Sequence, residues 1–108
     1  MLRTPAPLIG ALGVGTKMKQ LPDNVFSYKR TPDFTQDTIP AGLLRSHKTK
    51  EDVWGRIVVL EGSLRYRILE PLVEEIDLGP ALPGIVEPTV SHEVEAVGQV
   101  RFYVEFYR

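Results

Sequence analysis

The sequence predicts an all-β fold, a small antiparallel β-barrel or sandwich. Residues 64–68 and 100–107 alternate hydrophobic with other side chains, which is typical of strands with one face on a core. Nine prolines, spread between positions 5 and 88, leave little room for long helices. Short strands separated by turn signals favour a sandwich or barrel over an α/β fold.

The clearest predicted strand is the last segment, residues 100–107. The residues that share its apolar face are Val100, Phe102, Val104 and Phe106. Charged residues and tyrosines occupy the positions between them. This period of two predicts that one face of the strand packs on a core.

A hairpin is predicted from Ile57 to Ile68. Residues 56–60 read RIVVL, a short continuous apolar run that indicates a strand buried on both faces. The alternation resumes over residues 64–68. Between the two runs, Glu61-Gly62-Ser63 has the composition of a tight turn.

Further short strands are predicted over residues 74–78, 84–87 and 91–97, with a turn over residues 79–84. A single helical turn is expected near Pro32 to Gln36. Thr31 is a suitable N-cap, and Pro32 is favoured at the first helical position.

The composition excludes several classes of function. The net charge is −1, and no basic run is present, which argues against binding to nucleic acid or to an anionic membrane. No apolar run reaches the ~20 residues that a membrane-spanning helix needs. Cysteine is absent, which excludes disulfides, thiolate metal ligands and a cysteine nucleophile. These features fit a cytoplasmic protein.

Residues 1–20 are interpreted as an N-terminal extension, poorly ordered or docked as an arm, and residues 21–108 as a single domain. The stretch from Pro7 to Gly15 is apolar and glycine-rich. A secretory signal is the alternative interpretation, although only one basic residue precedes the apolar stretch. Met18 could be the natural start of the protein.

Three segments carry a resemblance to a known family: TPDFTQDTIPAGLLRSH (31–47), WGRIVVLEGSLRYRI (54–68) and PGIVEPTVSHEVEAVGQVRFYVEF (83–106). From residue 21 onward the chain resembles the cupin family found as the N-terminal domain of some TehB tellurite-resistance methyltransferases and as small stand-alone proteins of the YeaR type. The resemblance implies a double-stranded β-helix and a role in tellurite or other oxyanion stress. The methyltransferase half is absent, so the resemblance implies no methyl transfer by this chain.

The resemblance also implies a metal site at His47 and His92. In cupins, two histidines and a glutamate of a first motif and one histidine of a second motif hold the metal. His47 matches the first motif and His92 the second, whereas Thr49 and Gly55 stand where further ligands are expected. Glu105 is the first candidate replacement, because the family has an acidic residue there, and Glu51 is the alternative. The expected cofactor is one divalent transition metal (zinc, iron or nickel), and otherwise none.

More ordinary roles compete with these. Taken alone, a histidine is more often a surface or core residue than a ligand, and Glu105 could simply lie in solvent. Arg56 opens an apolar strand, where it could bind an anion or pair with Glu105 or Glu61. Tyr66 and Tyr103 could contribute hydroxyl groups to an anion pocket or serve as core and rim aromatics.

Three functions follow from these candidates. The first is a metal-binding domain, and the second is a metal-free module that binds a small anion through Arg56 and the histidines. The third is a homodimeric interaction domain, in which exposed Tyr103 and Tyr107 on the C-terminal strand cover a sheet edge. A separate methyltransferase is a candidate partner. Whether the protein is an enzyme stays open, because no residue is identifiable as a nucleophile.

Overall fold

The computed structural model describes residues 18–108, which form six strands and one short 3₁₀ helix. The elements are β1 (Ser27–Arg30), β2 (Phe34–Thr35), η1 (Ala41–Leu44), β3 (Trp54–Ile68), β4 (Glu74–Leu78), β5 (Gly84–Val86) and β6 (His92–Tyr107). All strands belong to one antiparallel sheet with the order β1-β6-β3-β4, in which β2 also pairs with β6 and β5 with β3. The all-β prediction is therefore confirmed. The sheet curves but does not close into a barrel, so the predicted barrel closure is wrong.

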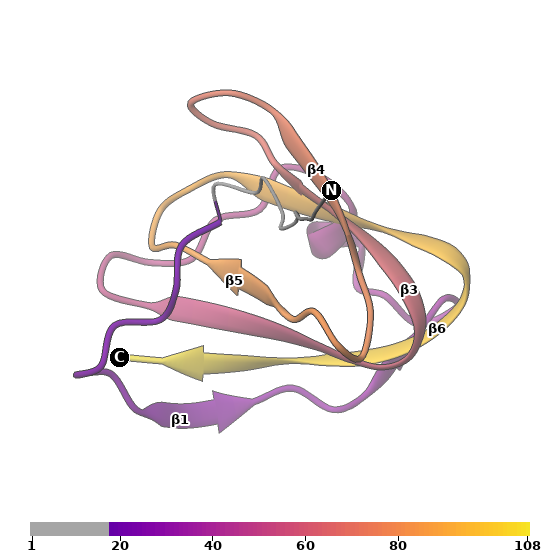
Figure 1. Cartoon of the computed structure of the whole chain (residues 1–108), viewed down its shortest axis with the longest axis horizontal. Helices are drawn as coiled ribbons and strands as arrows, with labels where there is room; N and C mark the ends of the chain where they lie inside the picture. Colours follow the sequence, from indigo (N-terminus) through magenta and orange to yellow (C-terminus); the bar gives the residue numbers. More distant parts are fainter. Residues whose placement is uncertain (1–17) are drawn as a thin grey trace, which may run out of the picture.

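The long strands β3 and β6 lie side by side and bend together (Figure 1). They pair from Trp54 opposite Tyr107 to Ile68 opposite His92. The predicted hairpin over residues 57–68 is thus wrong, because β3 continues through the expected turn and finds its partner in β6. The predicted strands 91–97 and 100–107 are likewise two parts of β6.

Glycines allow this ribbon to bend without a break. The pairing register shifts beside Gly62, and the partner residues jump from Val100 to Val97. Gly62 has φ +81° and Gly98 has φ +71°, values that side chains with a Cβ rarely adopt. A Cβ on Gly62 would lie 2.0 Å from the Gln99 carbonyl oxygen. The segment predicted as a turn is a β-bulge.

The hydrophobic core covers one face of the sheet, which we call the inner face. Ile57 and Val59 face it before the bulge, and Leu64, Tyr66 and Ile68 face it after the bulge. The alternation of β3 therefore changes phase at the bulge. The prediction that residues 56–60 are buried on both faces is wrong, because buried positions alternate there with half-buried ones.

The predicted inner face of the C-terminal strand is confirmed. Val100, Phe102 and Val104 are buried, and the ring of Phe102 contacts that of Phe34 edge-on, with 5.6 Å between the centroids. The predicted strands at 74–78 and 84–87 correspond to β4 and β5. However, β6 lies between β1 and β3, so the C-terminal strand is not a sheet edge.

The predicted helical turn near residues 32–36 is wrong. Thr31 is tied to β6 by two hydrogen bonds, from its amide to the Val104 carbonyl and from the Val104 amide to its Oγ1 (both 2.9 Å). These bonds hold the chain extended, so that β2 forms where the turn was expected. The short helix η1 comes later, after Pro40.

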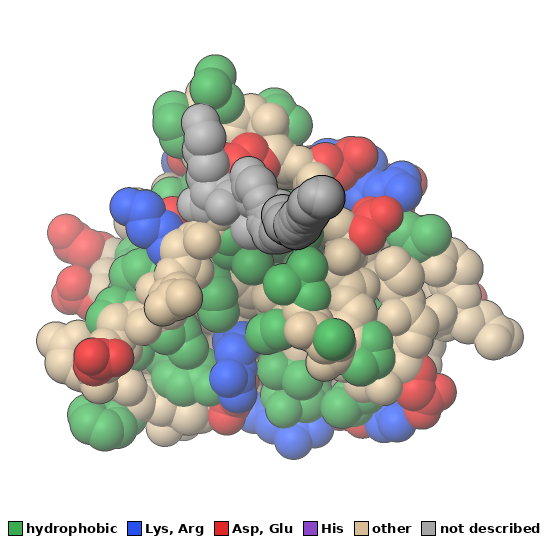
Figure 2. Space-filling model, in the orientation of Figure 1, with side chains coloured by type: hydrophobic (Ala, Val, Ile, Leu, Met, Phe, Trp, Pro, Cys, Tyr) green, Lys and Arg blue, Asp and Glu red, His purple; other side chains and the backbone are tan. Residues whose placement is uncertain are grey.

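The predicted N-terminal extension lies mostly outside the described residues, since the description begins at Met18. Met18 packs against the core, and its Sδ accepts a hydrogen bond from the Ile85 amide at 3.1 Å. Figure 2 shows acidic and basic side chains side by side around the rim of one face, with hydrophobic side chains between them. Within residues 18–108, no helix has the length and apolar character to span a membrane.

Candidate functional site

The fold brings His47 and His92 into contact, although they are 45 positions apart in the sequence. The two residues form an antiparallel bridge, in which the His47 amide donates to the His92 carbonyl (2.7 Å) and the His92 amide donates to the His47 carbonyl (2.9 Å). Their imidazole rings meet edge to face, with 5.4 Å between the centroids and 84° between the planes. The start of β6 and the segment after η1 therefore present one imidazole pair.

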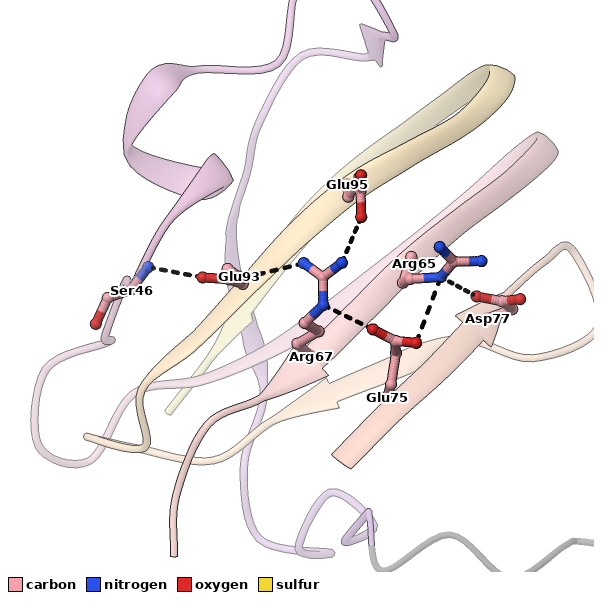
Figure 3. Close-up of polar contacts among 7 residues, drawn as sticks. All are labelled: Ser46, Arg65, Arg67, Glu75, Asp77, Glu93 and Glu95. Carbon is pink, nitrogen blue, oxygen red and sulfur yellow. Dashed lines mark hydrogen bonds and ion pairs between the residues drawn. The ribbon is translucent and has the colours of Figure 1, made fainter. Parts of the chain in front are cut away.

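Polar contacts on the other side of the sheet hold the His47 segment in place (Figure 3). Arg67 on β3 donates to Glu93 on β6 at 2.9 Å, and Glu93 accepts a hydrogen bond from the Ser46 amide at 3.4 Å. The hydroxyls of Ser46 and Ser91 lie 2.7 Å apart. The residue before each histidine is thus fixed to the other segment, which positions both rings.

Arg67 itself is held by three carboxylates. Besides Glu93, it donates to Glu75 on β4 at 2.7 Å and to Glu95 on β6. The hydrogen bond to Glu75, followed by that to Glu95, raises the pKa of Arg67. Neighbouring Arg65 pairs with Asp77 at 3.0 Å. These ion pairs link β4, β3 and β6 and stabilise the outer face of the sheet (Figure 3).

His92 is the more deeply buried of the two histidines, with 4% of its surface exposed. Its Nδ1 lies 3.2 Å from the Val90 carbonyl oxygen, and its ring packs edge-on against Tyr66 at 5.9 Å between centroids. Burial lowers the pKa of His92 and thereby favours its neutral form. The carbonyl accepts only from a protonated Nδ1, which assigns Nε2 as a hydrogen-bond acceptor.

The two imidazoles line a small cavity on the inner face. The cavity volume is about 20 Å³, which is room for about one water-sized group. Thr49 adds a hydroxyl, and the other walls are formed by apolar residues and Gly55, with Leu43, Val94 and Phe102 among them. Polar recognition within this cavity therefore falls to the histidines and Thr49.

The structure does not bring Glu105 or Arg56 to this cavity. They lie opposite each other on β6 and β3, on the outer face, and form an ion pair at 3.4 Å. The expected pairing of Arg56 with Glu105 is confirmed. Glu105 also accepts from Ser27 (2.8 Å) and Tyr107 (2.9 Å), and the bond from Ser27 is the main cause that lowers its pKa.

The two tyrosines predicted to bind a ligand do not line the cavity. Tyr66 is a core residue, 1% exposed, and its hydroxyl donates to the Ile85 carbonyl at 2.9 Å. Burial raises the pKa of Tyr66, which keeps this donor protonated. Tyr103 lies on the outer face under the Arg30 guanidinium, 3.6 Å from the ring centroid. Arg56, Tyr66 and Tyr103 therefore do not share one pocket with the histidines.

Comparison with known proteins agrees with this arrangement of strands. A family model described as TehB-like domain matches residues 29–104, which is more than half of the chain. The chain belongs to the TehB-like domain family. It is 32% and 30% identical, over 79 residues, to the probable S-adenosyl-L-methionine-dependent methyltransferases TehB of two Haemophilus influenzae strains.

Each alignment covers 69% of this chain but 28% of the methyltransferase, so the chain spans less than a third of the length of these relatives. The crystal structure of TehB from Haemophilus influenzae superposes with a TM-score of 0.73 at 30% identity, over 79% of this chain and 32% of that one. A crystal structure of an Escherichia coli K12 protein superposes with a TM-score of 0.76 at 24% identity, over 84% of this chain and 97% of that one. The second likeness shows the fold alone.

The donor set of this TehB-like domain is incomplete for a metal centre of the usual kind. Protein zinc sites use three or four protein ligands. Among residues 18–108, no group of three or more histidine and carboxylate side chains is close enough to hold one ion. The described residues provide His47 and His92, and further ligands would have to come from outside them.

Sequence reasoning missed a basic hollow beside the cavity of the TehB-like domain. Lys29, Lys48, Lys50 and Arg108 line it, and it shares His47 with the cavity. One signal for it was available, because Lys48 and Lys50 flank Thr49 immediately after His47. The contributions of β1 and of the C-terminus could not be found in this way, since only the sheet brings them there.

Proposed function

We propose that this TehB-like domain is a small-ligand-binding module, cupin-like in its use of a curved sheet, and that His47 and His92 contact the ligand. The observation that supports this most is the placement of two imidazoles on a small cavity whose remaining walls are nearly all apolar. Such a combination of apolar walls and few polar groups is typical of ligand sites. A His92 ring whose Nδ1 donates to the Val90 carbonyl offers its Nε2 as a hydrogen-bond acceptor there.

The relatives suggest the setting of this module. The Haemophilus proteins are named as probable methyltransferases, and this chain matches about a third or less of their length. We infer that the domain binds a ligand on behalf of a methyltransferase, which is its candidate partner. A cytoplasmic role in tellurite or other oxyanion stress belongs to the same proposal, and no methyl transfer is assigned to this chain.

A protein-detected NMR screen tests whether the cavity binds small ligands. The probes are acetate, propionate, acetamide and imidazole, each small enough to insert one group into the cavity. We expect at least one probe to shift the amide signals of His47, His92 and Val94, because these residues line the cavity. His92→Phe, which keeps an aromatic ring but removes both nitrogens, should abolish the shift.

The matched control is Tyr103→Phe, which also removes a polar aromatic atom, but on the outer face. It should bind like the wild type. If none of the four probes shifts these signals, or if both variants respond equally, the cavity is not a binding site and the proposal fails.

A transition metal is the second candidate ligand. The specific observation in its favour is the contact of His92 Nδ1 with a backbone carbonyl, since metal-binding histidines usually orient their second nitrogen in this way. Elemental analysis of protein purified without added metal decides this. Stoichiometric zinc, iron or nickel that disappears in both His47→Ala and His92→Ala would support a metal site, and metal-free folded protein would contradict it.

An interaction module without a ligand is the remaining alternative. In the structure, Tyr103 and Tyr107 are half-buried on the outer face, so they are not the exposed aromatics that a dimer edge would use. The exposed aromatic residues are instead Phe26 (73% exposed) and Tyr28 (43% exposed), which lie at β1, an edge of the sheet. A homodimer would therefore pair through β1 and not through β6.

A further inference from the structure

The lysines and arginines of this chain are placed differently. Five arginines form ion pairs with carboxylates in the structure: Arg30, Arg56, Arg65, Arg67 and Arg101. By contrast, three of the five lysines in the sequence (Lys29, Lys48 and Lys50) line a single hollow. The chain thus concentrates ammonium groups at one place while its net charge is −1.

This hollow is formed by three distant parts of the chain. Lys29 comes from β1, Lys48 and Lys50 come from the segment after His47, and Arg108 is the last residue. The hollow has a volume of about 370 Å³ and is open to solvent. This volume is within the range of small-molecule sites.

Acidic residues are absent from the lining that the described residues provide. Lys48 approaches Glu70 at 4.0 Å, the limit of an ion pair, and Arg108 stacks over the Tyr28 ring at 4.1 Å. Lys29 and Lys50 have no carboxylate within 4.0 Å among residues 18–108. Glu51 and Asp52 follow in the chain but do not line the hollow. Lys29 and Lys50 therefore carry positive charge that no carboxylate of the described residues pairs with, and such charge attracts anions.

The hollow and the histidine cavity are adjacent. His47, Thr49 and Phe106 line both of them. A ligand whose charged end lies among the lysines could therefore direct its other end past His47 toward His92. The small apolar cavity suits a short uncharged group, and the wide basic hollow suits a solvated anionic group.

We propose that the hollow binds the oxyanion end of a small ligand that carries at least two negative charges, such as a phosphate or phosphonate group. Lysine ammonium groups act as point charges without a fixed fork geometry, and they bind phosphate in this way. The proposal rests on the cavity function proposed above and specifies its ligand as anionic. Lys29, Lys48, Lys50 and Arg108 replace Arg56 as the anion-binding residues.

The test is an NMR titration of the folded chain with inorganic phosphate, methylphosphonate and propylphosphonate at constant ionic strength. We expect saturable shifts of the Thr49, Lys50 and Arg108 amide signals with all three probes. Lys50→Gln should weaken phosphate binding about three- to fivefold, the size of one exposed charge contact. The variant with Lys29, Lys48 and Lys50 all replaced by Gln should lose about tenfold or more.

Lys19→Gln is the matched control, because it removes the same charge from an exposed lysine outside the hollow. It should change binding less than twofold, and Lys50→Arg should retain binding. If phosphate causes no saturable shift, or if Lys19→Gln weakens binding as much as Lys50→Gln, the anion site is refuted.

The two alkyl phosphonates distinguish anion binding in the hollow from binding of an apolar group in the cavity. We expect propylphosphonate to bind more tightly than methylphosphonate, and His92→Phe to remove this difference without weakening phosphate binding. If phosphate binds but the propyl group does not tighten binding, one ligand does not occupy the hollow and the cavity together, and only the anion-binding role of the hollow is supported. Fragment binding at His92 without any phosphate response overturns the anion hollow and leaves the cavity function intact.

Discussion

Protonation of His92 would place a positive charge among apolar side chains and beside His47. Burial, the largest cause, and the charge of His47 both lower its pKa, whereas the Val90 carbonyl acts in the opposite direction. In the unfolded chain the histidine pKa is about 6.5. The unfolded state therefore takes up a proton before the folded state does, and folding stability depends on pH in this range.

We predict that the wild-type protein loses stability as the pH falls from 7.5 through 6.5 toward 5.5. The depressed pKa of His92 contributes stability that is fully present above the unfolded pKa and is lost as the pH falls through the folded pKa. Urea unfolding at these pH values measures the loss. His92→Gln should show a flatter pH dependence than the wild type. Parallel curves for the wild type and His92→Gln would contradict the prediction.

The sequence predicted which histidines form the site, but it did not predict on which face of the sheet the other candidate residues lie. The resemblance paired His47 with His92, and the fold does bring them together. Glu105 could not be placed from one strand, because alternation alone does not say which face is inner. Its register opposite Arg56 on β3 decides that it faces outward. Lys29 was missed because no local pattern connects β1 to the histidine segment.

At the scale of the elements, the phase change of β3 explains both what was predicted and what was missed. The continuous apolar run before Gly62 and the alternation after it identified both halves as strand, although the first half was wrongly predicted to be buried on both faces. A glycine between two strand-like runs is a signal for a turn or for a bulge, since both use a positive φ. Only the long-range partner β6 distinguishes them, and local sequence contains no information on that partner.

Gly62→Ala should destabilise the fold strongly. The added Cβ meets a backbone oxygen at 2.0 Å, and the positive φ adds strain of about 1–2 kcal/mol. We expect a loss of about 2 kcal/mol or more in the free energy of unfolding, measured with urea. Gly98→Ala, where φ is also positive but the space is open, isolates the strain and should cost about 1 kcal/mol.

Gly42→Ala is the control without strain or clash, because nothing lies within 4 Å of its Cβ position. It should leave stability within about 0.5 kcal/mol of the wild type. Equal effects at all three glycines would show that the bulge does not require its glycine.

For the whole molecule, the two edges of the sheet differ. The β4 edge carries Glu74, Glu75 and Asp77, and charge protects such an edge from pairing. The β1 edge instead has exposed Phe26 and Tyr28. If the chain forms a homodimer, this difference predicts that it forms through β1.

Sedimentation equilibrium tests this prediction. We expect a concentration-dependent dimer in the wild type and dissociation at least tenfold more favourable in Phe26→Ser, because the change removes exposed apolar surface from the edge. Leu72→Ser is the matched control, since Leu72 is similarly exposed (69%) but lies in the loop between β3 and β4. A wild type that is monomeric at all concentrations, or equal effects of the two variants, would rule out this interface.

The bulge in β3 also determines where the chain can tolerate changes in length. The inner face of β3 is formed by odd-numbered residues before Gly62 and by even-numbered residues after it. Deleting one residue between Leu60 and Ser63 would therefore turn the inner-face side chains of one half of β3 toward solvent. Residues 71–73 of the loop before β4 are exposed, unlike Leu69 and Glu70, which are hydrogen-bonded to Ser91, so insertions within 71–73 should be accepted. Related sequences should accordingly vary in length in that loop and keep their spacing at the bulge.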